Sequence, residues 1–268
     1  MRTLVEVIIE HYRFRRQIMV MAKTDLAKTY RRAALGWFWT IAKPSFMIFV
    51  YWFGIQIGLR ASRNVGPYPF FLWLIAGTVP WFYMHEMLTQ GTEAMRRYSY
   101  LITKVKFPVS IIPTFVSISH FMGNLPIVLI MIVLYWCYGY PPDIYILQLP
   151  FYMLYMVLFF CALTLLTSLL ATISRDVSNL MKSITSAVFW FSGVIWDVEA
   201  IRNESLKSLL MFNPVTFVCT GFRNVFVHKI WFYDQSKRMG YAGFTLLIII
   251  TLALFAYRKL RKEIPDVL

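Results

Sequence analysis

Two charged side chains inside long apolar stretches are the residues with the clearest chemical potential. Lys43 lies a few residues into the first apolar run, and Glu86 ends the run that begins at Phe70. An ionised side chain near the bilayer centre costs about 2.5–3.5 kcal/mol on insertion scales, so such residues usually serve a function. A helical wheel places Lys43 on one face with Trp39 and Met47, which favours a polar path. The alternatives are that the Lys43 ammonium extends to the membrane surface, and that the Glu86 carboxylate is hydrated or paired with arginine.

Aromatic side chains crowd the same first run and a second stretch close to residue 190. Rings at the ends of spans are typical of interfacial belts. Rings deeper in a span offer flat apolar faces with polar edges, which suit sugar rings that carry both C–H faces and hydroxyls. The candidate translocation path therefore consists of Trp39, Lys43, Phe46, Tyr51, Phe189 and Trp190.

Catalytic and metal-binding motifs are missing from the sequence. There is no HExxH, GxSxG or CxxC pattern, and no GxxxxGK[ST] loop that could hold nucleotide phosphates. The histidines and cysteines are scattered along the chain: His11, His85, His120, His228, Cys137, Cys161 and Cys219. We therefore expect no catalytic residue, metal or cofactor in this chain, and any use of ATP must come from a partner.

Composition indicates a membrane protein. Of 268 residues, 59% are hydrophobic and only 15% are charged, and the mean hydropathy is +0.58. Soluble domains are roughly 45–50% apolar and about 25% charged. The net charge of +14 would suggest nucleic acid on a soluble chain, but on an apolar chain it indicates cytoplasmic loops beside an anionic leaflet. We expect no nucleic-acid partner.

Apolar runs of roughly 20 residues predict an all-α protein with six transmembrane helices. The predicted spans are residues 37–59, 70–88, 109–138, 145–173, 178–196 and 243–257. Before the first span, after the second, after the fourth (with Lys182 counted there) and after the last there are together 18 lysines and arginines, against 8 on the other side of the predicted membrane. By the positive-inside rule both termini are cytoplasmic. We expect one domain over residues 1–268, with a cytoplasmic amphipathic segment (1–34), the membrane domain (35–257) and a cytoplasmic tail (258–268).

The intervals outside the spans also have distinct patterns. Leu4, Ile8 and Tyr12 recur at helical spacing opposite acidic and basic residues, which predicts a helix in the membrane interface rather than a solvated basic arm. The segment 92–107 is basic and predicts a short cytoplasmic helix that stops before Pro108. The interval 197–241 is apolar but broken, which predicts two half-inserted outer segments around Phe212, Asn213 and Pro214.

Positive residues gather on the predicted cytoplasmic side. Such charges attract phosphate groups, although topology alone could account for each one. The residues are Arg31, Arg32, Arg96, Arg97, Lys104 and Lys106.

Several ordered segments resemble the permease subunits of type-two ABC exporters of the polysaccharide and teichoic acid group. The segments are YRRAALGWFWTIAKPSFMIFVY (30–51), PYPFFLWLIAGTVPWFY (67–83), KFPVSIIPTF (106–115), Arg175-Asp176 followed by Leu180-Met181, and FNPVTF (212–217). The similarity extends over the whole chain and is greatest to wall teichoic acid translocation permeases.

That resemblance implies a homodimer in the bacterial cytoplasmic membrane with two copies of a cytosolic ABC ATPase, which would bind ATP and magnesium. It also implies that the turn 173–178, around Arg175 and Asp176, docks into the ATPase. By the same resemblance the segment between the second and third spans helps gate the channel, and the positive residues named above are a candidate gate and a candidate site for the lipid pyrophosphate head group. The expected function is export of a lipid-linked, undecaprenyl-type glycopolymer, most simply wall teichoic acid. Capsule or O-antigen export is the first alternative, then drug or bacteriocin export. A membrane-embedded glycosyl or acyl transferase would need an acidic or histidine cluster that the sequence lacks.

Overall fold

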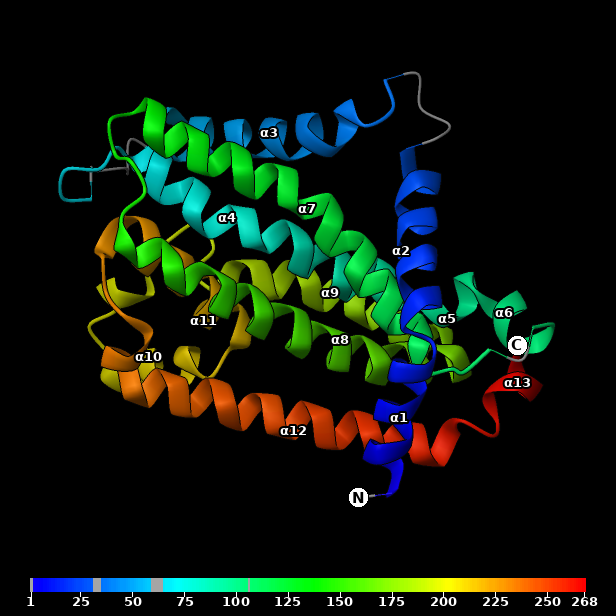
Figure 1. Ribbon diagram of the computed structural model, residues 1–268. Coiled ribbons are helices and arrows are strands. Elements are labelled where there is room, and N and C mark those ends of the chain that lie inside the picture. Colours follow the sequence, from blue (N-terminus) through cyan, green and yellow to red (C-terminus); the bar gives the residue numbers. More distant parts are fainter. Residues whose placement is uncertain (1, 31–34, 59–64, 106) are drawn as a thin grey trace.

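The computed structural model describes residues 2–30, 35–58, 65–105 and 107–268, and most of them lie in helices (Figure 1). The described residues form no strand, and Val65 and Tyr68 make one isolated bridge. The α-helices are α1 (Arg2–Arg13), α2 (Arg15–Tyr30), α3 (Phe38–Trp52), α4 (Phe70–Glu86), α5 (Ala94–Arg97), α6 (Ser99–Thr103), α7 (Ile111–Cys137), α8 (Leu149–Ile173), α9 (Arg175–Phe191), α10 (Glu204–Met211), α11 (Pro214–Arg223), α12 (Ser236–Leu260) and α13 (Ile264–Val267). The π-helices are η1 (Phe53–Gly58), η2 (Met87–Gly91) and η5 (Asn224–His228), and the 3-10 helices are η3 (Ile144–Gln148), η4 (Val198–Ala200) and η6 (Phe232–Gln235).

The long helices lie side by side with their axes in broadly one direction (Figure 1). At one end α1 and α2 run across this bundle, and α5, α6 and α13 gather there as well (Figure 1). We call this the α5 end, and the opposite end, where α10 lies, the α10 end. The first and last helices of the chain thus share one end of the molecule.

Four of the six predicted spans coincide with helices that are long and apolar enough to cross a membrane. They are Phe38–Gly58, Ile111–Cys137, Ile144–Ile173 and Phe232–Leu260. The second and fifth predicted spans coincide with α4 and α9, which have 17 residues each and are not among these four. The nearly all-helical membrane architecture is supported, and the total of six spans stays a prediction.

The fifth predicted span is displaced along the chain from the helix that forms. The predicted span began at residue 178, but α9 already begins at Arg175 and ends at Phe191. The Ser174 side chain accepts a hydrogen bond of 3.2 Å from the Asp176 backbone N–H, the usual way in which serine starts a helix. Arg175 and Asp176 therefore belong to the first turn of a helix, and the predicted turn shrinks to Ser174.

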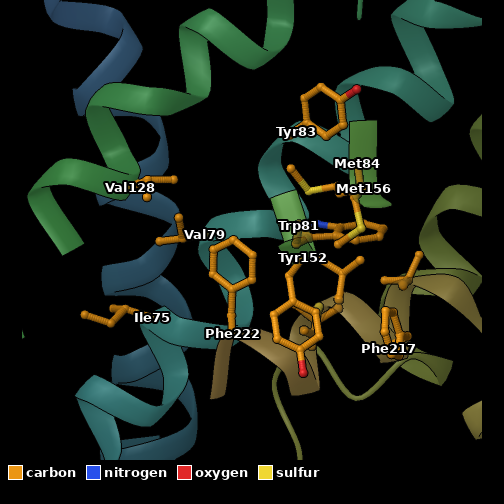
Figure 2. Close-up of a cluster of buried hydrophobic side chains, with 14 of the residues drawn as sticks. Ile75, Val79, Trp81, Tyr83, Met84, Val128, Tyr152, Met156, Phe217 and Phe222 are labelled. Atoms are coloured by element: carbon orange, nitrogen blue, oxygen red, sulfur yellow. The ribbon is translucent and has the colours of Figure 1, made fainter. Parts of the chain in front are cut away.

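Helix α4 is the centre of the bundle. Most of its side chains are buried, on every side of the helix, as expected for a helix whose apolar residues are not confined to one stripe. Figure 2 shows Ile75, Val79 and Met84 of α4 among side chains from α7, α8 and α11. In contrast, α3 buries only Thr40 and Ile48.

Two short helices form in the interval between α9 and α12. They meet at Asn213, whose side chain accepts a 2.9 Å hydrogen bond from the Val215 backbone N–H. Pro214 occupies the first turn of α11, where its missing N–H costs nothing. The break at Asn213-Pro214 is therefore as predicted, whereas insertion of these segments into a membrane stays a prediction. Helix α11 is largely buried and packs against α4 and α8.

The N-terminal segment forms the predicted amphipathic helix, α1, with its polar side against the bundle. Glu10 accepts hydrogen bonds from Ser110 and from Tyr257, the latter at 3.2 Å, and Glu6 pairs with Arg261. The apolar side chains are exposed: Leu4, Val5, Ile8, Ile9 and Tyr12. The helix predicted over 92–107 is instead two helices, α5 and α6, because the chain breaks at Tyr98 (φ −110°, ψ 25°).

Candidate functional site

A cavity of about 550 Å³ lies between α3, α4, α7 and α9. Five of the six residues of the predicted path line it: Trp39, Lys43, Tyr51, Phe189 and Trp190. Phe46 does not line the cavity and is 66% exposed. Helix α3 carries aromatic residues on several sides. The sequence therefore did not distinguish the face that lines the cavity from the face that is exposed outside the bundle.

Ion pairs and hydrogen bonds connect one side of the cavity to α5. The Lys43 ammonium lies 3.9 Å from the Glu86 carboxylate. Gln90 donates a 2.6 Å hydrogen bond to Glu86, and Arg97 donates to the side chain and the backbone carbonyl of Gln90 at 3.1 and 2.8 Å. Lys182 of α9 pairs with Glu93 at 2.7 Å. The cytoplasmic segment predicted as a gate is thus bonded to residues that line the cavity.

Gln90 occupies η2, a stretch of π-helix between α4 and α5. A π-helix shifts the following side chains around the helix axis and is frequent at functional sites. A helical wheel drawn with the 100° per residue of an α-helix would therefore place Gln90 on the wrong face. The sequence analysis did not single it out.

Aromatic rings form another part of the cavity wall. The Phe189 ring centre lies 5.2 Å from that of Tyr51 and 5.4 Å from that of Trp81. The Trp81 ring in turn lies 5.9 Å from the His85 ring. These separations fall within the usual range for interacting aromatic pairs. The result is a continuous set of ring faces and edges contributed by α3, α4 and α9.

Three polar side chains of the lining have atoms that are buried but lack a hydrogen-bond partner. They are the Thr40 hydroxyl, the His120 Nε2 and the Asn124 amide nitrogen. Buried polar groups are nearly always hydrogen-bonded, so each unpaired one requires an explanation. His120 and Asn124 were not predicted as site residues. Their spacing of four within the apolar run 109–138 was the available signal, because it places both on one face of a helix.

The cations predicted on the cytoplasmic side are only partly accessible to a ligand. Arg96 donates to the Thr172 carbonyl at 3.4 Å, Arg97 binds Gln90, and Lys104 is exposed. Arg31, Arg32 and Lys106 lie outside the described residues. The structure therefore places Arg96 and Arg97 at the α5 end but commits both side chains to intramolecular contacts.

A hydrogen bond joins the segment 92–107 to helix α2. The Tyr98 hydroxyl donates to the buried Asp25 carboxylate of α2. Burial, and then the contact with Asp25, raise the pKa of Tyr98, so the phenol stays protonated and keeps donating. Together with the Arg97 contacts, this bond fixes the C-terminal end of the short α5 helix.

The remaining predicted residues lie apart from the cavity. Arg175 and Asp176 are exposed where α8 gives way to α9. Phe212 stacks on Tyr241 with ring centres 4.0 Å apart, and Asn213 donates to Ser192 at 2.7 Å, which ties the α10–α11 junction, including Pro214, to the end of α9. Among the described residues, no three His, Cys, Asp or Glu side chains form a group that could hold a metal ion.

Residues 16–227 match the family model described as ABC-2 type transporter. The chain belongs to the ABC-2 type transporter family. It is similar to the O-antigen export system permease protein RfbA of Myxococcus xanthus, with 26% identity over 92% of this chain and 93% of the relative. It is also similar to two O-antigen export system permease proteins RfbA of Klebsiella pneumoniae, with 23% and 21% identity, each over 94% of both chains.

Membership of the ABC-2 type transporter family gives the chain a transport role and implies an ABC ATPase partner in a membrane setting. These relatives carry the name of the alternative that the sequence analysis placed second, O-antigen export, and not the name of teichoic acid export. The broader resemblance to polysaccharide exporters is confirmed. The expected teichoic acid branch has no support from the relatives.

Proposed function

We propose that this chain is the membrane subunit of an ATP-driven exporter that moves a lipid-linked polysaccharide of the O-antigen or capsule kind out of the bacterial cytoplasm. The observation that carries the proposal is the match to O-antigen export permeases over more than nine tenths of the chain. The cavity supports it, because its aromatic rings and uncharged polar groups suit a glycan. Two copies of the chain and two ATPase subunits complete the transporter.

The polymer path runs between two copies of the chain. Helices α3 and α9 provide one wall of the cavity, and both expose large apolar side chains, among them Phe49 and Trp190. In a dimer these faces bring two cavities together around one passage. Spans one and five then line the passage, as the sequence analysis expected.

Coupling to the ATPase takes place at the α5 end. Arg175 and Asp176 are exposed there and contact the ATPase, and the rigid first turn of α9 carries the movement toward Phe189 in the cavity wall. The lipid pyrophosphate approaches the positive cluster at the same end.

The test is deletion of the gene in the organism that encodes it, followed by analysis of the cell surface and of the lipid-linked polymer inside the cell. We expect the surface polysaccharide to disappear and a lipid-linked glycan to accumulate at the cytoplasmic face. The wild-type gene restores export only when the partner ATPase can hydrolyse ATP. An accumulated polymer with one phosphate per repeat would instead identify teichoic acid. Normal surface polymer with increased drug sensitivity would identify a drug exporter.

A further inference from the structure

We infer that the cavity between α3, α4, α7 and α9 selects an uncharged glycan segment and disfavours a polyol-phosphate chain. The inference rests on the proposed export function and adds a charge preference at a defined site. It depends on which polar groups in the cavity have partners and which do not. The same cavity contains cations, carboxylates, amides and rings, so their pairing decides what chemistry remains available to a ligand.

Each cation of the cavity lining has a carboxylate beside it. Lys43 is paired with Glu86 at 3.9 Å and Lys182 with Glu93 at 2.7 Å. Glu93 lies beside the cavity rather than in its lining, and with the histidines counted as neutral these four side chains sum to zero charge. A site for phosphate has the opposite character, because it presents arginine, lysine or backbone donors without neighbouring anions.

A hydrogen bond holds the Glu86 carboxylate in addition to its pair with Lys43. Gln90 donates to its second carboxylate oxygen, and Arg97 fixes Gln90 through both the side chain and the backbone. A phosphate that approached Lys43 would therefore meet a carboxylate held in place, and like charges at this separation repel. The hydrogen bonds from α5 thus keep the cavity neutral.

The polar atoms that remain unpaired belong to uncharged side chains. The Thr40 hydroxyl and the Asn124 amide nitrogen are buried without partners, and so is the His120 Nε2. A hydroxyl can donate and accept at once, and an imidazole and an amide each offer both functions. Sugar hydroxyls have the same dual character, so a glycan that displaces the side chains covering these buried atoms can satisfy all three groups. The rings of Tyr51, Trp81 and Phe189 lie in the same lining and offer faces for the sugar C–H groups.

The experiment measures binding to the purified full chain in nanodiscs, with the fluorescence of Trp39, Trp81 and Trp190 in the cavity as the signal. The two probes are mannohexaose, which is neutral, and a glycerol-phosphate hexamer, which is anionic. We expect mannohexaose to bind at least tenfold more tightly than the anionic hexamer. Asn124→Leu and the milder Thr40→Val should each weaken mannohexaose binding by fivefold or more.

A gain of binding provides the sharper measurement. The double variant Glu86→Gln with Glu93→Gln removes both neutralising charges, and we expect it to bind the anionic hexamer at least tenfold more tightly than the wild type does. The matched control is Glu204→Gln, an exposed carboxylate in the first turn of α10, which should change neither probe. Size-exclusion profiles identify variants that do not fold, and these are replaced by the single Glu86→Gln variant.

The inference is overturned if the wild type binds the anionic hexamer as tightly as mannohexaose or binds neither probe. It is also overturned if the double variant gains nothing or if the Glu204→Gln control gains as much. These outcomes are distinct from failure of the export function, which the deletion strain measures separately. Normal polysaccharide export together with absent charge preference would reject this inference and leave the export function standing.

Discussion

The Arg223 guanidinium lies 3.5 Å from the centre of the Trp73 ring. From this position its nitrogens donate to the Gly193 and Val194 carbonyls, each at 2.6 Å. One buried side chain of α11 thus holds α4 and the turn that follows α9. The same turn is connected to the α10–α11 junction through Ser192 and Asn213.

Replacing Arg223 by methionine should lower stability markedly. Two buried carbonyls lose their donor, at about 1–3 kcal/mol for each unsatisfied group, and the contact with Trp73, about 2 kcal/mol for a desolvated pair, is lost as well. Thermal unfolding of the purified chain in detergent measures the effect, with Arg202→Gln, an exposed arginine of the α10 end, as the control. Equal midpoints for Arg223→Met and wild type would contradict the role of this side chain.

Gly77→Ala should destabilise the same junction from the α4 side. A Cβ at Gly77 would lie 2.3 Å from an Arg223 nitrogen and 2.6 Å from the Val194 carbonyl oxygen. The carbonyl belongs to the backbone, so it cannot move aside without shifting the chain around it. Overpacking of this kind costs about 1–3 kcal/mol. Gly54→Ala is the control, because nothing lies within 4 Å of its added Cβ. A difference of less than a degree between the two unfolding midpoints would show that the close approach is unimportant.

Glu10→Ala should release α1 from the bundle. The carboxylate accepts from Ser110 and Tyr257, so its loss removes the acceptor that joins α1 to α7 and α12. We expect faster amide hydrogen exchange in α1 and little change in α8. Arg16→Gln, an exposed substitution on α2, serves as the comparison and should leave exchange in α1 as it is in the wild type.

Arg175→Ala combined with Asp176→Ala should weaken association with the ATPase and reduce transport-coupled ATP hydrolysis. Both side chains are exposed, so the free energy of unfolding should change by no more than the few tenths of a kcal/mol typical of surface substitutions. Co-purification with the partner provides the measurement. Glu204→Ala, also in the first turn of a helix but at the α10 end, is the control. Full association of the double variant with the ATPase would place the contact elsewhere.

The long helices were predictable because a run of about 20 apolar residues has few alternatives to a membrane helix. Helices α7 and α8 follow the predicted ranges closely. The central place of α4 was not predictable, because a helix that is apolar on every side has no stripe to reveal its neighbours. For the same reason the aromatic residues of α3 could be named but not divided into cavity and surface, and Phe46, which does not line the cavity, was grouped with residues that do.

The polar part of the site was only half visible in the sequence. Lys43 and Glu86 stood out because ionised groups are costly in apolar runs. Their pairing with each other, and the part played by Gln90, depend on how α3 and α4 meet and on the π-helical turn of η2. Neither is encoded in a local spacing, whereas the four-residue spacing of His120 and Asn124 was.

Helix α1 has the reverse of the orientation found in a soluble protein, because its charged side is bonded to α7 and α12 and its apolar side is exposed. In a bilayer the exposed side seeks the acyl boundary, and the depth at which it settles is set by the lipid. Since Glu10 is bonded directly to Ser110, the residue that precedes α7, we expect that depth to influence the height of α7, and with it of His120, in the membrane. We therefore expect the thickness of the bilayer to affect the transporter. Thinner and thicker membranes should give different rates of transport with the same substrate.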